Sequence, residues 1–542
     1  MLSNNRYLHQ ARWAWSLTKG HRRRLFFFFL LELSAIVLSL TFVFWSKNAV
    51  DIATGAQSGN LNLALLITVA TLLLAMTLRS LATWINERSK MEILKDIQNQ
   101  VVRTQMWSTW KLVKAMHTGD IQVRLNNDCQ EIAQVVVYAL PNFLLTFIRI
   151  LASLSVLWVL DPMLALLILA ISPLFLFSKL YFRRLSKLNM EVKRAESELG
   201  RVIQENLRFR LSIRALGLDA IRWGKIRSSQ HYIIEIKKKL LNFSTFSQST
   251  VRACVNIGFL MTFAWGVYRL DANEISFGTL TAFLQLVGRI QAPMLAMMSF
   301  LPLFVRFRTS VTRIQELLDT ETEEQVEPVT LISPEALHVQ QVSFRYDDVD
   351  VIRELSARFV KGQPTAIIGS SGKGKTTLIR MMLALIHPDK GRIEIIDAQG
   401  ANLLSTAHRG NFAYVPQGDK LFSGTIRDNL QYQQTKPSDE ELRVALHLAC
   451  ADFVYTLPEG IDTVIGESGY GLSEGQAVRI AIARAVLSTA SIWLFDEITA
   501  ALDMETGAVL MDRLIAAGSD KILIFVTHDQ QAAARCTQQM YI

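Results

Sequence analysis

Long apolar runs alternate with charged segments over the first three hundred residues, and this pattern predicts membrane-spanning helices. A hydrocarbon core of about 30 Å is crossed by roughly 20 residues. Runs of that length are found at 25–45, 61–84, 134–159, 162–182, 247–269 and 277–304. The alternative, core helices of a large soluble bundle, is disfavoured because the run Leu25–Leu31 has no polar face to present to water. Six spans are therefore predicted.

Flanking Lys and Arg residues indicate the orientation of these spans, because cytoplasmic loops carry an excess of them. Residues 1–24 contain six Lys or Arg residues and no acid, whereas 46–60 contains one Lys and one Asp. Segments 85–133 and 183–246 are long and basic, and apolar residues recur in them at helical spacing. We therefore expect both termini and two helical extensions to be cytoplasmic, and the chain to lie in the cytoplasmic (inner) membrane.

A phosphate-binding loop is indicated further along the chain. The segment 369–377 reads GSSGKGKTT, follows an apolar run and precedes a helix-like stretch, so it fills every fixed position of GxxxxGK[ST]. Glycines let backbone N–H groups close around phosphate, Lys375 meets its charge, and the Thr376 hydroxyl reaches Mg²⁺. The alternative for the loop alone is a Gly-rich turn. The candidate ligands are Gly369, Ser370, Ser371, Gly372, Lys373, Gly374, Lys375, Thr376 and Thr377.

Two adjacent carboxylates downstream favour nucleotide hydrolysis over a simple turn. The apolar run 491–495 is typical of a buried strand, and it ends in Asp496 and Glu497. Phosphoryl transfer depends mostly on positioning and charge neutralisation. Asp496 is therefore expected to hold Mg²⁺, and Glu497 to polarise the water that attacks the γ-phosphate.

Composition divides the chain near residue 310, where the apolar excess ends. An acidic stretch with Pro328 and Pro334 follows and is expected to be a solvated linker. Within the region after it, an α/β core should carry the phosphate loop, and a helical lobe should lie near 425–485. The predicted domains are a cytoplasmic segment 1–24, a transmembrane domain 25–314, a linker 315–335 and a nucleotide-binding domain 336–542.

The order of further motifs resembles that of ATP-binding cassette (ABC) exporters over essentially the whole chain. Leu472–Gln476 is similar to the family signature LSGGQ, Gln417 to the Q-loop and Ala500–Asp503 to the D-loop. His528 matches the switch histidine, and Tyr346 matches the aromatic residue that stacks on adenine. The resemblance implies ATP and Mg²⁺ as cofactors.

This resemblance assigns roles to individual residues. Catalysis is expected from Glu497, His528 and Gln417. Nucleotide contacts beyond the phosphate loop are expected from Tyr346, Asp496, Ser473, Gly475, Gln476 and Asp503. Ligands of Mg²⁺ are expected to be Thr376, Gln417 and Asp496.

The resemblance also implies a fold and an assembly. The expected fold is a membrane α-helical bundle of six transmembrane helices with long cytoplasmic extensions, fused to an α/β P-loop ATPase cassette with a helical lobe. In this family the signature of one cassette completes the site on the phosphate loop of another. The working unit is therefore a dimer, and since this chain carries both halves intact we predict a homodimer.

Some positions depart from the family pattern. Glu474 replaces the first signature glycine and adds a carboxylate that would slow hydrolysis by repelling the γ-phosphate. Ser468 stands where relatives often carry arginine, which would alter coupling to the membrane part, and the chain stops soon after His528. Segments 117–120 and 213–217 are similar to the coupling segments of the family. The alternative for both is a solvated helix face.

Charge and cysteine content exclude other classes of protein. The net charge of +9 comes largely from residues beside the predicted spans, where anionic lipid explains it, so lipids and not nucleic acid are expected as partners. The four cysteines lack CxxC spacing, which argues against a zinc site or a disulfide framework. The first apolar run has full span length and lacks a small-residue cleavage site, so no cleavable signal is predicted.

Ionisable residues inside the spans suggest the chemistry of the cargo. They are Glu32, Arg79, Arg149, Arg252 and Arg289. Four positive charges against one negative favour an anionic or zwitterionic amphiphile. The alternative is that the arginines reach the interface or pair internally, as Glu32 with an arginine. Our hypothesis is that Arg252 and Arg289 contact the substrate.

Three functions compete on this scaffold. The first is ATP-driven export of an amphipathic substrate (lipid, peptide or drug-like) by alternating access. The second is a lipid flippase, which differs only in cargo. The third is a regulator or pore gated by ATP without pumping, which the presence of Glu497 and His528 disfavours. An importer is disfavoured because the spans and the cassette are fused.

Overall fold

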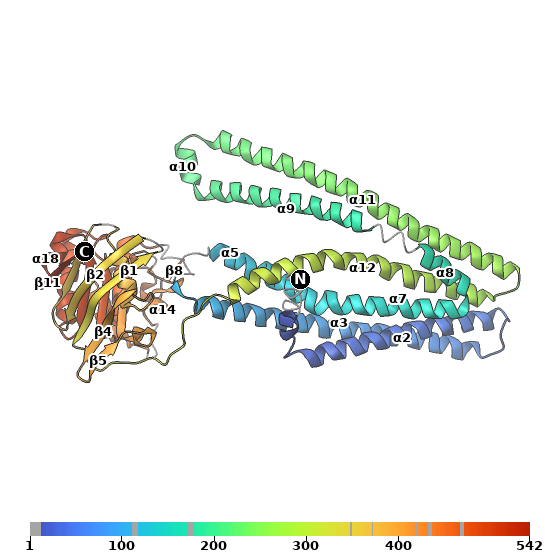
Figure 1. The fold of residues 1–542 in the computed structure, drawn as a ribbon, viewed down its shortest axis with the longest axis horizontal. Helices are drawn as coiled ribbons and strands as arrows, with labels where there is room; N and C mark the ends of the chain where they lie inside the picture. The colour runs from blue at the N-terminus through green and yellow to red at the C-terminus, as the bar shows by residue number, and fades with distance from the viewer. Residues whose placement is uncertain are drawn as a thin grey trace. The chain divides into compact units, whose positions relative to one another are not determined.

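The computed structural model describes residues 12–110, 118–171, 178–346, 349–370, 372–418, 420–431, 436–466 and 471–542 (Figure 1). The chain divides into two compact units. One is helical and contains the described residues up to 104 together with 118–319. The other contains 105–110 and the described residues from 320 to 542, and it carries the β-sheets.

The helical unit consists of long helices joined by short connections. Its elements are α2 (Arg22–Ala53), α3 (Leu61–Met106), α5 (Thr118–Val123), the π-helical η1 (Arg124–Asp128), α6 (Cys129–Ala133), the π-helical η2 (Gln134–Ala139), α7 (Leu140–Leu160), α8 (Pro162–Ile171), α9 (Ser178–Arg208), α10 (Arg210–Ala215), α11 (Asp219–Asp271) and α12 (Phe277–Leu318).

Length and composition qualify four stretches of the described chain to cross a membrane. These stretches are Arg22–Ala53, Leu61–Met106, Gly119–Leu160 and Asp219–Asp271. Each contains one of the runs predicted from the sequence. Of the other two predicted spans, 162–182 includes residues 172–177, which lie outside the described residues, and 277–304 lies in α12, which is not among these four stretches. The count of six spans therefore stays a prediction.

Several helices are far longer than a bilayer requires, which confirms the predicted helical extensions. The helix α3 has 46 residues and α11 has 53, whereas roughly 20 residues cross a hydrocarbon core. The helices α9 and α11 lie side by side (Figure 1). Val192 and Ala195 of α9 pack there with Ile233 and Ile236 of α11.

A buried carboxylate ties one end of this unit together. Asp161, in the one-residue connection between α7 and α8, is 1% exposed and accepts from the backbone N–H of Leu164 at 3.0 Å, so it caps α8. It also accepts from the Trp265 indole at 3.1 Å and forms an ion pair with Arg269, both on α11. The connection between α7 and α8 is thus held to the last turns of α11.

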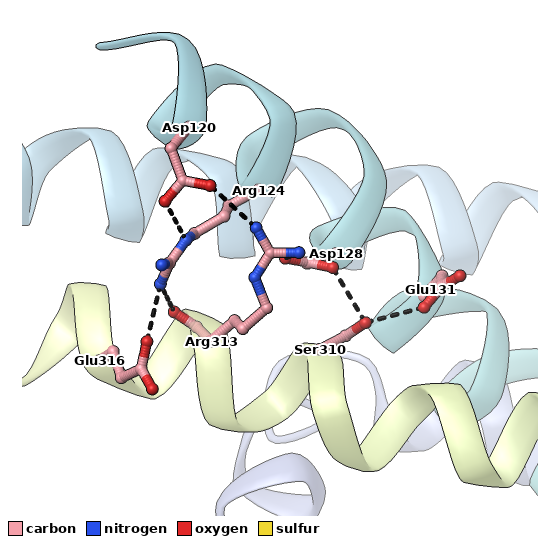
Figure 2. Close-up of polar contacts among 7 residues, drawn as sticks. All are labelled: Asp120, Arg124, Asp128, Glu131, Ser310, Arg313 and Glu316. Carbon is pink, nitrogen blue, oxygen red and sulfur yellow. Dashed lines mark hydrogen bonds and ion pairs between the residues drawn. The ribbon is translucent and has the colours of Figure 1, made fainter. Parts of the chain in front are cut away.

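A second polar network holds the last turns of α12 to the α5–α6 region (Figure 2). Arg124 donates to Asp120 at 2.8 Å and to Glu316 on α12 at 2.9 Å. Arg313 on α12 donates back to Asp120 at 3.0 Å. One turn earlier, the Ser310 hydroxyl donates to the carboxylate of Glu131 at 2.7 Å. The end of α12 that leads to the linker is therefore fixed by charged groups rather than by apolar packing alone.

The second unit is built around two sheets. The antiparallel sheet has the order β2 (Val349–Val360), β1 (Ala336–Tyr346), β4 (Lys390–Asp397) and β5 (Gly400–Leu403). The parallel sheet has the order β11 (Gln538–Tyr541), β3 (Thr365–Ile368), β10 (Ile522–Thr527), β9 (Ile492–Asp496) and β6 (Phe412–Val415). Every residue of β9 and β10 is buried, as expected for parallel strands covered on both faces.

Helices and short strands complete this unit. They are α13 (Lys375–Met382), β7 (Gly424–Thr425), α14 (Ile426–Leu430), α15 (Asp439–Leu448), β8 (Val464–Ile465), α16 (Glu474–Val486), α17 (Met504–Ala517) and α18 (Gln530–Ala534). The helices α14 and α15 pack on α16. The helical bundle and the α/β unit together confirm the fold class predicted from the sequence.

The segment before residue 111 contributes to the α/β unit, which the sequence did not reveal. The backbone of 107–109 pairs with 321–323, through Thr109 N–H to the Glu321 carbonyl at 3.0 Å and Glu323 N–H to the Trp107 carbonyl at 2.8 Å. Trp110 packs on the apolar core between the sheets and α13, and the Arg380 guanidinium lies 5.0 Å from its ring centroid. This stacking is a cation–π contact.

Candidate active site

Four parallel strands deliver functional residues to one edge of their sheet. The phosphate loop follows β3, Gln417 follows β6, Glu497 follows β9 and His528 follows β10. Because these strands run in the same direction, their carboxyl ends meet. A cavity of about 490 Å³ opens there, lined by Val351, Gly372, Gly374, Lys375, Thr376, Thr377, Gln417, Glu497 and His528.

The phosphate loop requires glycine at particular positions. Gly372 and Gly374 have φ of 86° and 97°, a left-handed conformation that side chains with a Cβ rarely adopt. A Cβ on Gly374 would also lie 3.0 Å from the carbonyl oxygen of Val351. Gly374 caps α13, so the loop presents the amino terminus of that helix to the cavity. Such a terminus suits an anionic phosphate group.

Lys375 supplies the positive charge of the loop. Its side chain is only 8% exposed, and its ammonium group donates to the carbonyl oxygen of Gly369. The Nζ atom lies 4.0 Å from Oε1 of Glu497. A buried ammonium group between a carbonyl and a carboxylate is held ready for a phosphate oxygen.

Glu497 is the centre of the polar groups that line the cavity. Gln417 donates from Nε2 to one carboxylate oxygen, and Nδ1 of His528 lies 3.5 Å from the other. The backbone of Glu497 has φ of 52°, in the left-handed region, and its N–H donates to the Val526 carbonyl at 2.9 Å. Such strain costs on the order of 1–3 kcal/mol and is common where function fixes a side chain.

Asp496 lies at the end of β9, 4% exposed and outside the residues that line the cavity. Burial, and then the neighbouring charge of Glu497, raise the pKa of Asp496 to about 6. Tyr414 on β6 is half-buried beside it, and its pKa is raised by desolvation first and by the charge of Asp496 second. A carboxylate whose negative charge is under-compensated is suited to a cation.

The residues present therefore fit Mg²⁺. They combine one buried carboxylate, Asp496, with the hydroxyl of Thr376 and the amide of Gln417. Mg²⁺ is usually held by one or two carboxylates together with substrate phosphates and water, not by an all-protein cage. The described residues contain no group of three or more His, Cys, Asp or Glu side chains that could hold a metal ion.

The signature residues lie apart from this cavity. Ser473 caps α16 and forms a reciprocal pair with Gln476, with hydrogen bonds of 2.9 and 3.2 Å. A Cβ on Gly475 would lie 2.6 Å from the carbonyl oxygen of Ala501, so α16 and the loop between β9 and α17 are in close contact. Asp503 caps α17 through the N–H of Thr506 at 2.8 Å. None of these residues lines the cavity.

The structure places two further residues that the sequence analysis singled out, Tyr346 and Glu474. Tyr346 ends β1 and accepts from Arg380 at 3.2 Å, and it is not among the lining residues. Glu474 is 77% exposed and its carboxylate lies 3.6 Å from the Lys420 ammonium group, so its charge has a partner in this chain. Three residues lie outside the described part of the chain. They are Ser371 of the phosphate loop, Ser468, and His117, which begins the first expected coupling segment.

Two residues of the site were missed by sequence reasoning. Val351, on β2, lines the cavity although no motif includes it. Arg380, on α13, contacts both Tyr346 and Trp110. Its position four residues after Thr376 on the same helix was an available signal, because such residues share a helix face.

The two arginines expected to contact substrate lie on different helices. Arg289 of α12 has its guanidinium 5.8 Å from the centroid of the Phe42 ring. Arg252 is exposed on α11. The charged groups that act on Arg289 are those of Arg79 and Arg149, and Arg252 is not among them.

Comparisons with known proteins agree with this architecture. The family model described as ABC transporter matches residues 352–500, and the one described as ABC transporter transmembrane region matches 25–294. Relatives from two strains of Staphylococcus aureus, NCTC 8325 and COL, are named for multidrug export as ATP-binding/permease proteins. Each is 25% identical over 456 residues, which is 83% of this chain and 78% of the relative.

A solved structure has the same fold. The structure of a bacterial Atm1-family ABC exporter with ATP bound gives a TM-score of 0.78 at 24% identity, covering 96% of this chain and 93% of its own.

Proposed function

Because the chain belongs to the ABC exporters and couples ATP hydrolysis to transport across a membrane, we propose that two copies of it export an amphipathic substrate by alternating access. The observation that carries this proposal is the grouping of Lys375, Gln417 and His528 around Glu497, in a cassette fused to membrane helices. The substrate class is lipid, peptide or drug-like.

The side chains of the cavity divide the work of hydrolysis. Lys375 and the amino terminus of α13 bind the phosphates of ATP. Glu497 accepts the proton of the attacking water, and Gln417 and His528 orient its carboxylate. Thr376, Gln417 and Asp496 would hold Mg²⁺, which supplies neutralisation of the charge that develops on phosphate oxygens. The strained backbone of Glu497 keeps its carboxylate in place before substrate arrives.

A homodimer is supported by the separation of the two halves of the site. The signature residues Ser473, Gly475 and Gln476, together with Asp503 of the D-loop, do not line the cavity that contains the phosphate loop. A second copy would bring its signature to this cavity and receive the first copy's signature in return. Tyr346 is proposed to stack on adenine. Each dimer would therefore hold two equivalent ATP sites.

The membrane arrangement follows from the basic flanks of the spans. We place both termini and the cassettes on the cytoplasmic side of the cytoplasmic membrane, with six spans per chain between residues 25 and 314. Binding of ATP would favour the closed pair of cassettes and one orientation of the spans, and hydrolysis would release it. A flippase would use the same cycle on a lipid.

The test uses the full-length protein in inverted proteoliposomes with Mg²⁺, ATP and a panel of fluorescent amphiphiles, among them a labelled phospholipid and a labelled apolar peptide. Accumulation against a gradient supports a pump. Movement of the phospholipid alone between leaflets supports the flippase. Equilibration without accumulation would refute pumping. Lys375→Ala should abolish turnover and accumulation, whereas Lys390→Ala, at the exposed start of β4, should not.

A further inference from the structure

Four helices of the membrane unit each bring one ionisable residue to the same cluster. They are Glu32 on α2, Arg79 on α3, Arg149 on α7 and Arg289 on α12. Arg149 Nη2 lies 3.4 Å from a carboxylate oxygen of Glu32. The charge of Arg79 acts on both Arg149 and Arg289, and that of Arg149 also acts on Arg289. We call these four residues the arginine cluster.

The charges of the arginine cluster do not balance. Three guanidinium groups face one carboxylate, and Glu32 forms an ion pair with Arg149 only, among the described residues. The Nε atoms of Arg79 and Arg149 are buried and have no hydrogen-bond partner among the described residues. Buried donors are nearly always paired, because an unpaired one costs about 1–3 kcal/mol. The cluster therefore has a net positive charge and spare donors.

The positions of these arginines argue against a merely interfacial role. At 1.5 Å per residue, Arg79 lies about 8 Å from the end of its predicted span, 61–84, whereas Arg149 and Arg289 lie about 15 and 18 Å from the nearer ends of theirs, 134–159 and 277–304. Long side chains near helix ends can reach the interface, but residues this deep usually face a cavity or one another. Here Arg149 pairs with Glu32, and Ala82, one turn from Arg79, packs in the same apolar cluster as Leu145, one turn from Arg149, so like charges are brought close together.

We propose that the arginine cluster binds the anionic group, a phosphate or carboxylate, of an amphipathic substrate within the membrane. The inference rests on the proposed export function and assigns its substrate class. Guanidinium groups bind such anions through paired hydrogen bonds. The apolar part of the ligand would contact Phe42, whose ring faces Arg289, and Met294 on α12, which is partly buried. Glu32 acts as the resident counter-charge that positions Arg149.

The test measures binding of radiolabelled dodecyl phosphate to the nucleotide-free full-length protein in neutral detergent. Competitors are laurate, dodecanol and inorganic phosphate. We expect laurate to compete and dodecanol, which has the same chain without a charge, to compete at least tenfold more weakly. Weak competition by inorganic phosphate identifies the amphiphile as the ligand. Strong competition by it supports the same anion site with a soluble anion as ligand.

Variants separate binding from structural roles. Arg79→Gln and Arg289→Gln should each weaken binding of dodecyl phosphate at least tenfold, and Arg289→Lys should restore part of it. The matched control is Arg88→Gln, on the same helix as Arg79 but paired with Glu92 outside the cluster. Glu32→Gln should tighten binding severalfold, because it removes the competing carboxylate. A purely structural ion pair would show no tightening.

Several results would overturn the inference. The first is that wild type, Arg79→Gln and Arg289→Gln bind dodecyl phosphate equally well. The second is that dodecanol and laurate compete equally. The third is that Arg252→Gln loses binding whereas Arg79→Gln and Arg289→Gln keep it. Retained ATP hydrolysis shows that a variant is folded. Pumping without any preference for anions would refute this inference alone, whereas anion binding without ATP-driven accumulation would refute only the proposed export.

Discussion

Replacing Asp496 with asparagine is expected to stabilise the nucleotide-free protein while removing its response to Mg²⁺ and ATP. Burial and the charge of Glu497 raise the pKa of Asp496 in the folded protein from 3.8 to about 6. The folded pKa lies above the unfolded one, so ionised Asp496 lowers the free energy of unfolding above pH 6. That loss is recovered as the pH falls from about 6 to below 4. A shift of about two pKa units corresponds to on the order of 3 kcal/mol.

Thermal unfolding of the full-length protein in detergent with EDTA, followed by tryptophan fluorescence, measures this effect. At pH 7.5 the variant should unfold roughly 6–12 °C above wild type, since 1 kcal/mol shifts a unit of this size by about 2–4 °C. At pH 5 the difference should fall to about half. Added Mg²⁺ and ATP should raise the unfolding temperature of wild type only.

A matched control is Asp397→Asn, another buried carboxylate of the same unit. Asp397 accepts from the backbone N–H groups of Gln399 and Gly400 at 2.8 and 3.1 Å, so its loss should destabilise the protein. Equal unfolding temperatures for wild type and Asp496→Asn at pH 7.5, or a difference that does not change between pH 7.5 and 5, would show that burial of this charge is not costly.

Three further predictions follow from particular contacts. Mixing wild type with Glu497→Gln chains should depress ATP hydrolysis more than dilution does, because each site is shared; loss in proportion to dilution would contradict the dimer. Gly475→Ala should slow hydrolysis at least tenfold and lower the unfolding temperature, because its Cβ would lie 2.6 Å from the Ala501 carbonyl; unchanged kinetics would show that the loop yields. Trp110→Ala should destabilise the protein by about 2 kcal/mol, because it removes buried apolar surface and the contact with Arg380. The control is Trp107→Ala, whose side chain is exposed, and its unfolding temperature should stay within about a degree of that of wild type.

The sequence predicts most of what depends on local pattern. Apolar runs indicated the long helices, and the phosphate loop between β3 and α13 was evident because its glycines and Lys375 stand at fixed spacing. The family resemblance named Glu497, Gln417 and His528 as catalytic residues, and all three line one cavity. The number of spans, the homodimer and the site roles remain predictions.

Contacts between distant segments could not be predicted. Nothing in the composition of 105–110 shows that Trp110 packs beside α13, because the partner Arg380 is 270 residues away along the chain. The hypothesis that Arg252 and Arg289 contact the substrate stays a prediction, and the sequence did not show that the charges of Arg79 and Arg149 act on Arg289. Helix rotation decides which side chains meet, and hydropathy alone does not fix it.

The pairing of 107–109 with 321–323 has a consequence for protein production. The α/β unit is assembled from two stretches of chain that are separated by the whole of the helices α5 to α12. A fragment that starts at Ala336 would lack Trp110, which stacks on Arg380 of α13, and would also lack the acidic segment 321–323, with which residues 107–109 pair. Such a fragment would expose an apolar patch beside its nucleotide site and self-associate, whereas supplying residues 105–110 as a peptide would restore its solubility.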